Sequence, residues 1–431
     1  MRSLVATVFV VVVACAPATE RPSAAAAPSA SQIASARPDR AAAWRADIAT
    51  LIPGMAALHP NLTHSASRAQ LEDAAAALAA AVPSLTDDQI LVGLMRIVGT
   101  VTSGGCDAHT GLYVWGEGSY PVDSLPLRVW WFDEGIYVID ARPPYRELIG
   151  ARIDAVNGRA MSEILAAIAP LVPRDNDTTL RLLAPRYVVI PQVLRGLGLI
   201  GADPLTLEVT PPGGPQRRVG VAPIAMSEYN DWAGGYGLFL PDDPNVLYLS
   251  RASEPLWWTA LDGGAVLYVQ YNRAVYLSQA TIDGLHAALA TTHDKVVVDI
   301  RHNYGGDIGS VAPVLAALRD PSVDRAGRLF VVTGRNTFSA ASMFLARLQA
   351  ATSAVVVGEP MGGCPNPIGN ARPLPLRNSG LVVEVGTSQE TAVSADDHRH
   401  QIPPALPARL TPEAWRAKVD PALAAIRAYR P

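Results

Sequence analysis

The chain has 431 residues, 49% of them hydrophobic, and a formal net charge of −4. That length predicts two or three domains with ample material for a buried core. Because basic and acidic residues nearly balance, at 35 against 39, and no basic run occurs, nucleic acid is not an expected partner.

The N terminus has the pattern of an export signal. Arg2 precedes the apolar run Leu4–Ala14, which ends at Cys15. A basic residue before an apolar run of this length is typical of exported proteins, and the run is too short to span a bilayer. Val12-Val-Ala-Cys15 resembles a bacterial lipobox, in which the cysteine is acylated, although Val stands where Leu is favoured. We predict a lipid anchor through Cys15 on the extracytoplasmic side of a bacterial membrane; ordinary secretion and a retained membrane anchor are alternatives.

The composition along the chain divides it into five segments. Ala16–Ala36 is rich in Ala, Pro and Ser and cannot form a core, which indicates a flexible tether. The expected segments are a signal peptide at 1–15, the tether at 16–40, a helical region at 41–118, a β-rich region at 119–245 and an α/β core at 246–431.

The helical region ends in a glycine pair followed by a histidine. Apolar residues at helical spacing predict helices between Arg45 and Val101. Gly104-Gly-Cys-Asp-Ala-His109-Thr110 follows, and the glycines free the backbone to bring the His109 imidazole into a cleft. His59 and His64 lie between helices and are expected to be surface loop residues. Neither a His-x-x-x-His nor a Cys-x-x-Cys pattern occurs, so no metal or cofactor is predicted.

Alternating apolar residues predict strands through the β-rich region. The expected strands are Leu127–Phe132, Gly135–Asp140, Ala151–Val156, Leu205–Val209 and Arg217–Val221. Arg174–Tyr187 is polar and is predicted to be a mobile connection.

The stretch Val296–Val357 alternates strands and helices at a spacing that predicts a parallel sheet. Sites in such sheets gather beyond the carboxyl ends of the strands. Ser339 lies there, at a sharp turn between the strand Leu329–Thr333 and the helix Met343–Ala351. Its hydroxyl could face a cleft while backbone N–H groups at the helix start bind an oxyanion. The alternative is that Ser339 only caps the helix, which serine does well.

Three motifs in register carry a family resemblance. Asp299-Ile-Arg-His-Asn-Tyr-Gly-Gly306, Thr337-Phe-Ser-Ala-Ala-Ser342 and Asp107-Ala-His-Thr110 occur in the order found in tail-specific (C-terminal processing) serine peptidases. The chain resembles that family, which includes tricorn core protease and the repeats of interphotoreceptor retinoid-binding protein. The resemblance spans roughly Arg45 to the C terminus. It implies an α/β fold with a crotonase/Clp-like ββα catalytic core, and Glu147–Gly158 resembles part of a PDZ-like module, here short and incomplete.

The resemblance also implies the catalytic groups. Tail-specific members use a Lys about 25 residues after the serine, but 339 + 25 = 364 is Cys364, and the only lysines are Lys295 and Lys418. Tricorn-like members use a His from the N-terminal motif instead, a role that His109 fits. The nucleophile would be Ser339, activated by that base.

Two further groups of residues complete the implied site. The acid that orients His109 would be Asp397, or else Asp396; because Ala108 replaces the usual hydroxyl residue, Thr110 or Asp107 could substitute for it. The oxyanion donors would be the N–H groups of Ala340 and of Gly305 or Gly306.

Two cysteines remain after Cys15, namely Cys106 and Cys364. An even pair in an oxidising compartment favours a disulfide. We predict that this pair joins the loop of His109 to the loop beyond the nucleophile helix; two separate buried thiols are the alternative.

These observations predict an exported serine peptidase that cleaves peptide bonds of peptide or protein substrates. Departures from the family pattern leave a second possibility, a non-catalytic binding protein of the same fold: Met343 replaces a common Glu, and Ala405 replaces the terminal Asp. An esterase of another fold is disfavoured because no Gly-x-Ser-x-Gly sequence occurs.

Overall fold

The computed structural model describes residues 39–116, 120–202, 204–234 and 238–430. The predicted signal peptide, its Cys15 and nearly all of the tether lie outside these residues. Among the described residues, no helix combines the length and the apolar character needed to cross a bilayer.

Three helices follow the tether, as predicted: α2 (Arg40–Leu58), α3 (Arg68–Ala81) and α4 (Asp87–Val101). Both α3 and α4 begin with a capping box, in which Ser67 pairs with Gln70 and Thr86 with Gln89. These reciprocal bonds satisfy N–H groups that a helix start leaves free, which fixes where each helix begins.

An antiparallel sheet follows, and its strands confirm all five predicted ones. They run in the order β2 (Leu127–Phe132), β3 (Gly135–Ala141), β4 (Arg152–Val156), β6 (Thr206–Thr210) and β7 (Arg217–Gly220). Helix α5 (Met161–Ile168) shares the apolar core of this sheet.

The prediction of a mobile connection at Arg174–Tyr187 was wrong. Helix α6 occupies Asp177–Val188, and most of its residues are buried. The Asn176 side chain caps it by accepting the N–H groups of Thr178 and Thr179. A polar segment usually lies at the surface, but the buried polar side chains of α6 form hydrogen bonds inside the protein. Polar composition therefore did not indicate a mobile connection here.

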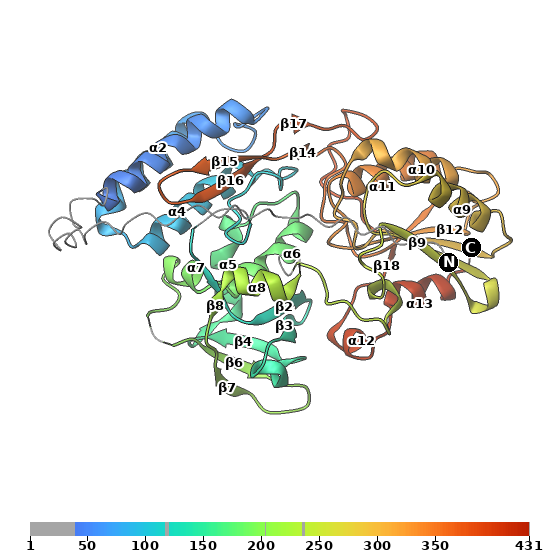
Figure 1. The fold of residues 1–431 in the computed structure, drawn as a ribbon, viewed down its shortest axis with the longest axis horizontal. Coiled ribbons are helices and arrows are strands. Elements are labelled where there is room, and N and C mark those ends of the chain that lie inside the picture. Colours follow the sequence, from blue (N-terminus) through green and yellow to red (C-terminus); the bar gives the residue numbers. More distant parts are fainter. Residues whose placement is uncertain (1–38, 117–119, 203, 235–237, 431) are drawn as a thin grey trace, which may run out of the picture. The chain divides into compact units, whose positions relative to one another are not determined.

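The second half is built on a six-stranded sheet in the order β18-β13-β12-β11-β10-β9, parallel except for β9. The strands are β9 (Leu256–Leu261), β10 (Val266–Tyr271), β11 (Lys295–Asp299), β12 (Leu329–Thr333), β13 (Val355–Gly358) and β18 (Leu406–Pro407). Helices α9 (Gln279–Leu289), α10 (Ala312–Leu318) and α11 (Ala340–Ala351) cover one face, and α13 (Pro421–Ala428) covers the other (Figure 1). The predicted parallel sheet with helical crossovers is confirmed.

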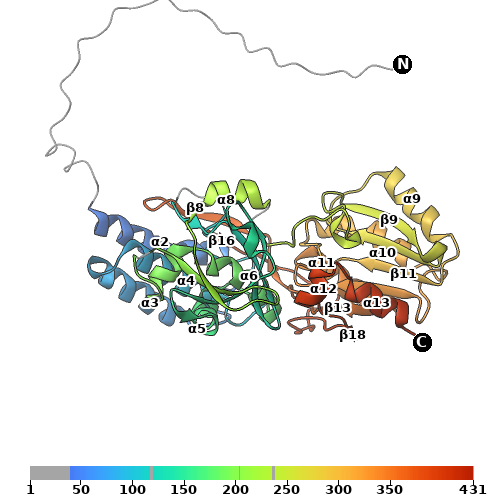
Figure 2. The same cartoon turned by 90° about the horizontal axis from the view of Figure 1, so that it is seen from below.

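A hairpin from this half joins the core of the first. Strands β15 (Arg372–Leu376) and β16 (Leu381–Val385) pair with each other, and their apolar side chains pack with those of α2 and α4. Figures 1 and 2 both show β16 beside these helices. The Asp47 carboxylate on α2 accepts N–H groups from Asn378 and Ser379 at the hairpin tip.

The remaining elements are short. The C-terminal part contains two short helices, α12 (Pro412–Arg416) and α13, and the two-residue strand β17 (Ser388–Gln389). The others are β1 (Asp123–Ser124), β5 (Arg159–Ala160), α7 (Pro191–Gly196), β8 (Ile224–Ala225), α8 (Met226–Ala233) and β14 (Ile368–Gly369).

Candidate active site

Ser339 lies at the carboxyl end of β12, directly before the first residue of α11. Its backbone has φ 54° and ψ −126°, a conformation that non-glycine residues rarely adopt and that costs about 1–3 kcal/mol. Although Ser339 holds the N-cap position, its side chain makes no capping hydrogen bond. The capping alternative therefore does not describe this serine, whose hydroxyl is directed elsewhere.

Neighbouring segments hold the strained turn. The Thr337 hydroxyl donates to the Ile300 carbonyl at 2.9 Å, and the Phe338 N–H donates to the Asn303 carbonyl at 3.1 Å. The Gly363 N–H donates to the Thr337 carbonyl at 3.0 Å. These bonds tie the turn after β12 to the turn after β11 and to the loop after β13.

Gly305 packs directly against the nucleophile. A Cβ at this position would lie 2.7 Å from Ser339 Cβ, and Gly305 has φ 105°, so only glycine fits. Its N–H donates to Asn303 Oδ1 at 3.0 Å, whereas the N–H of Gly306 has no acceptor among the described residues. The first N–H of α11, at Ala340, has no intrahelical acceptor. Of the predicted oxyanion donors, Ala340 and Gly306 are the free ones.

His109 reaches the nucleophile. Its Nε2 lies 3.1 Å from Ser339 Oγ, although 230 residues separate the two in sequence. The imidazole also stacks on Phe338, with ring centroids 4.6 Å apart, so the residue next to the serine fixes the plane of the ring. The two side chains have the separation that a serine and its general base require.

A buried carboxylate holds the loop that carries His109. Asp175 Oδ1 accepts the Ala108 N–H at 2.6 Å, and Oδ2 accepts the Cys364 N–H at 2.9 Å. The Tyr113 hydroxyl donates to the Ala108 carbonyl at 2.6 Å. Both sides of Ala108, the residue before the base, are thus fixed. Burial raises the pKa of Asp175 to about 7 despite these two N–H bonds. Sequence reasoning missed Asp175 and Tyr113.

The sulfur atoms of Cys106 and Cys364 lie 2.01 Å apart, at disulfide distance, as predicted. Beside this link, the Ile368 N–H donates to the Cys106 carbonyl at 2.8 Å. On the other side of His109, Gly111 exchanges two backbone hydrogen bonds with Glu384 of β16. The base loop is therefore fastened at both ends to the C-terminal half.

Asp397, the acid predicted to orient His109, is not bonded to it. Both oxygens of Asp397 bind the Arg399 guanidinium, at 2.8 and 2.7 Å, and Asp396 is exposed. His109 Nδ1 is buried, and no acceptor among the described residues forms a hydrogen bond of good geometry with it; the Ile368 backbone carbonyl is the acceptor that interacts with this ring. Neither predicted acid is therefore bonded to the base, because the short Asp397-to-Arg399 contact captures the carboxylate locally.

Burial lowers the pKa of His109 to about 4, although the ring is only half-buried at the molecular surface. The charge of Asp107, the backbone carbonyl of Ile368 and the charge of Glu390 act in the opposite direction. The imidazole is therefore neutral at pH 7, as a base must be. Glu390 is an acidic residue that sequence reasoning missed; it follows the short strand β17.

His59 and His64 lie in the loop between α2 and α3, as predicted, but His59 is buried and His64 is only partly exposed, so neither is a free surface residue. Their Nε2 atoms lie 3.0 and 3.1 Å from Asp107 Oδ2. Burial alone would raise the pKa of Asp107, but the hydrogen bonds from the two histidines outweigh it and lower the pKa. Neither Asp107 nor Thr110, whose hydroxyl accepts the Gly386 N–H, is bonded to His109.

The same three residues could also be considered as metal ligands, since their ligand atoms lie within 4.8 Å of one another. A metal-bound histidine normally donates a hydrogen bond through its other ring nitrogen. In His59 that nitrogen, Nδ1, instead accepts the Asn61 N–H at 3.1 Å. The neutral ring therefore carries its proton on Nε2, facing Asp107, and the cluster is better suited to hydrogen bonding than to holding an ion.

A buried ion network supports the turn after β11. Arg301 binds Asp299, the last residue of β11, and both oxygens of Asp420 at the start of α13. Its guanidinium stacks 4.2 Å from the Tyr248 ring centroid. Both charges of each pair are satisfied, so the turn that presents Gly305 and Gly306 is rigidly anchored.

The chain shares its fold with solved structures of CPAF. A serine-to-alanine mutant of CPAF has a TM-score of 0.62 at 12% identity, covering 91% of this chain and 99% of that one. Mature CPAF complexed with lactacystin gives 0.57 at 12% identity, covering 88% and 96%. A photosystem II D1 C-terminal processing protease is more distant, with a TM-score of 0.37 at 15% identity. No protein-family model and no curated protein matches the sequence. The likeness confirms the predicted α/β fold.

Proposed function

We propose that the protein is a serine peptidase of the tricorn-like type, in which Ser339 attacks a peptide carbonyl and His109 is the base. The observation that carries the proposal is the 3.1 Å contact between His109 Nε2 and Ser339 Oγ. The left-handed backbone of Ser339 supports it, because strain of this kind gathers at catalytic residues. The fold shared with CPAF is consistent with the assignment.

The mechanism follows from the proton positions. A neutral His109 that accepts from the Ser339 hydroxyl carries its own proton on Nδ1. As Oγ bonds to the carbonyl carbon, its proton moves to Nε2 and negative charge develops on the carbonyl oxygen. The free N–H groups of Ala340 and Gly306 are the donors for that oxyanion. Nε2–H then protonates the leaving amine, and water, activated by the same nitrogen, hydrolyses the acyl-enzyme.

Labelling with a fluorophosphonate probe tests this chemistry, because the probe reacts only with an activated serine. Wild type should be labelled at Ser339, while Ser339→Ala and His109→Ala should not be labelled. Asp397→Asn is the matched control and should be labelled like wild type. A folded wild-type protein that resists the probe would refute the proposal.

One observation favours a second candidate, a non-catalytic binding protein. The buried Nδ1 of His109 lacks the hydrogen-bonded carboxylate that orients the base in serine hydrolases, and only the Ile368 backbone carbonyl interacts with the ring as an acceptor. The imidazolium formed during catalysis would then rely on the charges of Asp107 and Glu390. Unlabelled wild type that still binds peptides would favour this candidate.

We also propose export to the bacterial cell envelope with a lipid anchor on Cys15, outside the described residues. The cysteine pair supports an oxidising compartment. Metabolic labelling with an alkyne fatty acid should mark wild type in the membrane fraction, and Cys15→Ala should lose both label and membrane association. Equal fractionation of the two proteins would contradict the anchor.

A further inference from the structure

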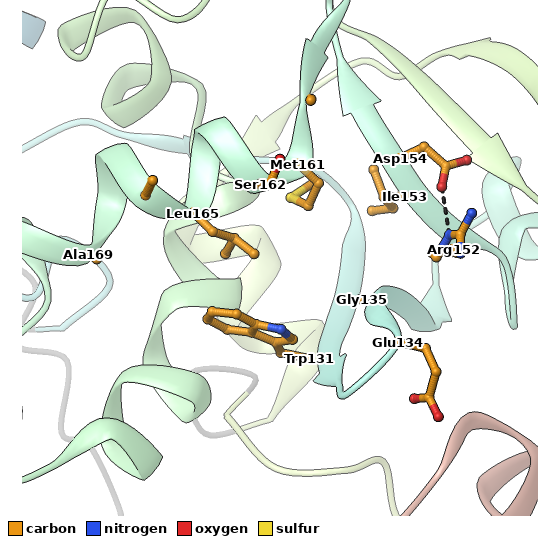
Figure 3. Close-up of a pocket in the computed structure, with 12 residues that line it drawn as sticks. Trp131, Glu134, Gly135, Arg152, Ile153, Asp154, Met161, Ser162, Leu165 and Ala169 are labelled. Atoms are coloured by element: carbon orange, nitrogen blue, oxygen red, sulfur yellow. Dashed lines mark hydrogen bonds and ion pairs between the residues drawn. The ribbon is translucent and has the colours of Figure 1, made fainter.

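A cavity of about 580 Å³ opens between α5 and the antiparallel sheet. Figure 3 shows Trp131 of β2, Ile153 of β4, and Met161 and Leu165 of α5 gathered around it. Apolar side chains form its walls, so it suits an aliphatic or aromatic side chain. The reaction proposed for Ser339 makes no use of this cavity.

A PDZ module binds a peptide by adding it as a strand to an exposed sheet edge. Here the edge strand that lines the cavity is β2, and α6 packs on both β2 and α5. Arg181 of α6 lies over the Trp131 ring, 5.4 Å from its centroid, and the Leu125 N–H before β2 donates to the Val189 carbonyl after α6. The chain's own helix therefore occupies the place where a peptide terminus would pair.

The other edge strand, β7, offers no substitute. It is four residues long, and its exposed Arg217 and Arg218 are paired with Glu147 and Glu208. Short, charged edge strands resist the addition of another strand.

The charges around the cavity also disfavour a terminal carboxylate. Its only cationic lining residue, Arg152, is committed to Asp154 at 2.6 Å, an ion pair drawn in Figure 3. Glu134 at the rim adds an unbalanced negative charge. The neighbouring cation Arg181, which lies over Trp131, is paired with Asp133 at 2.6 Å, so a free C terminus placed here would meet Glu134 and only cations that are already paired.

The cavity is joined to the turn of the nucleophile. Arg335 precedes Ser339 by 339 − 335 = 4 residues, and its guanidinium donates to the backbone carbonyl of Trp131. It also pairs with Glu359 at 2.7 Å and stacks 4.9 Å from the Trp130 ring centroid. The backbone of the cavity residue Trp131 is thus bonded directly to the turn that carries the nucleophile.

We infer that this cavity binds an apolar side chain from an internal segment of the polypeptide substrate, and that a free C-terminal carboxylate contributes nothing to recognition. The inference rests on the proposed peptidase function. It assigns unstructured internal stretches of protein, rather than chain ends, as the substrate class.

Matched substrates test the role of the chain end. A peptide mixture from denatured casein is divided into free-acid and C-terminally amidated halves, and new N termini are counted by mass spectrometry, with Ser339→Ala as blank. Wild type should cut the same bonds in both halves at rates within about twofold. A tenfold or greater loss on amidation would overturn the inference. If neither half is cut and the fluorophosphonate does not label Ser339, the result contradicts the proposed peptidase function itself, on which this inference rests.

A blocked cavity tests the site itself. Ala166 lines the cavity from an exposed position on α5, so Ala166→Trp fills the space without disturbing the core. KM for an internal-site peptide should rise about tenfold with kcat unchanged. Glu163→Trp, exposed on the same helix but outside the cavity lining, should stay within twofold of wild type. A wild-type KM for Ala166→Trp would overturn the assignment.

Discussion

The two sides of the candidate site are built in different ways. The nucleophile turn, Gly334–Ser339, is fixed by bonds to the turns after β11 and β13, all within one sheet. The base loop, Gly104–Gly111, is fixed by Asp175, by the link to Cys364 and by β16, three segments far apart in sequence. The nucleophile is therefore placed by local topology, and the base by tertiary packing. Substitutions should damage the two sides differently.

Removing either reacting group should have the largest effect. Ser339→Ala and His109→Ala should each lower kcat by about 10⁴-fold or more, because the serine is unreactive without its base. The double variant should be no worse than either single one, since the two groups act as a unit. Peptide hydrolysis measures this, with circular dichroism to verify folding; additive losses would contradict a shared proton transfer.

Loosening the base loop should have a smaller but clear effect. In Asp175→Asn the amide can accept only one of the two N–H groups, so kcat should fall about tenfold while KM stays unchanged. An unfulfilled buried N–H also costs about 1–3 kcal/mol of unfolding free energy. Asp177→Asn, at the start of α6, is the neighbouring control. Unaltered kinetics in Asp175→Asn would show that the loop does not depend on this carboxylate.

Asp175 also predicts a pH dependence of stability. Its pKa is raised by burial from 3.8 to about 7, so its stabilising contribution is complete below pH 3.8 and is lost as pH rises through 7. Between pH 5 and 8 wild type should lose roughly 2–3 kcal/mol of unfolding free energy from this group, because only about two pKa units of the shift fall inside that window. Urea unfolding at both values measures the difference, which should shrink in Asp175→Asn; equal shrinkage in Asp177→Asn would point to another group.

The link between Cys106 and Cys364 offers a second way to loosen the base side alone. The double serine variant should lose about 2–4 kcal/mol of unfolding free energy. Dithiothreitol should reproduce that loss in wild type and change nothing further in the variant. If wild type instead shows two reactive thiols besides Cys15 under denaturing, non-reducing conditions, the disulfide is absent.

The acids around the base should give the smallest effect. Because the pKa of His109 is about 4, the acid limb of kcat/KM should fall near pH 4 rather than near 6.5. Glu390→Gln removes a charge that raises this pKa and should move the limb to lower pH, while Asp397→Asn should leave it in place. A shift in Asp397→Asn alone would restore the predicted role of that residue.

The difference between the two sides also explains what the sequence could reveal. The strands and turns around Ser339 follow from local patterns of apolar residues and glycines, and His109 is marked by the glycines before it. Asp175 and Tyr113 carry no local signal, because their importance comes from which backbone groups they meet after folding. The choice of Asp397 as the orienting acid failed for the same reason. The sequence shows that Asp397 is acidic, but it does not show that Arg399 binds both of its carboxylate oxygens.

His59 illustrates the limit from another direction. A histidine after a helix usually faces solvent, and no residue near His59 in the sequence indicates that it is buried against Asp107. The helices between Arg45 and Val101 were predictable, because helical spacing and caps such as that of Thr86 are properties of neighbouring residues. Burial of a polar side chain depends on distant segments and was not predictable from the sequence.

The hairpin of β15 and β16 makes the two halves mutually dependent. Separating the polypeptide into two fragments at residue 245 would expose Leu376, Leu381 and Val383, which pack in the core shared with the N-terminal helices. It would also leave the Asp47 carboxylate without its backbone N–H donors at Asn378 and Ser379. Neither fragment would be a self-sufficient module. A chimeric protein in which one half is replaced must therefore keep the hairpin together with the N-terminal helices it covers. Otherwise the chimera will expose apolar surface and aggregate.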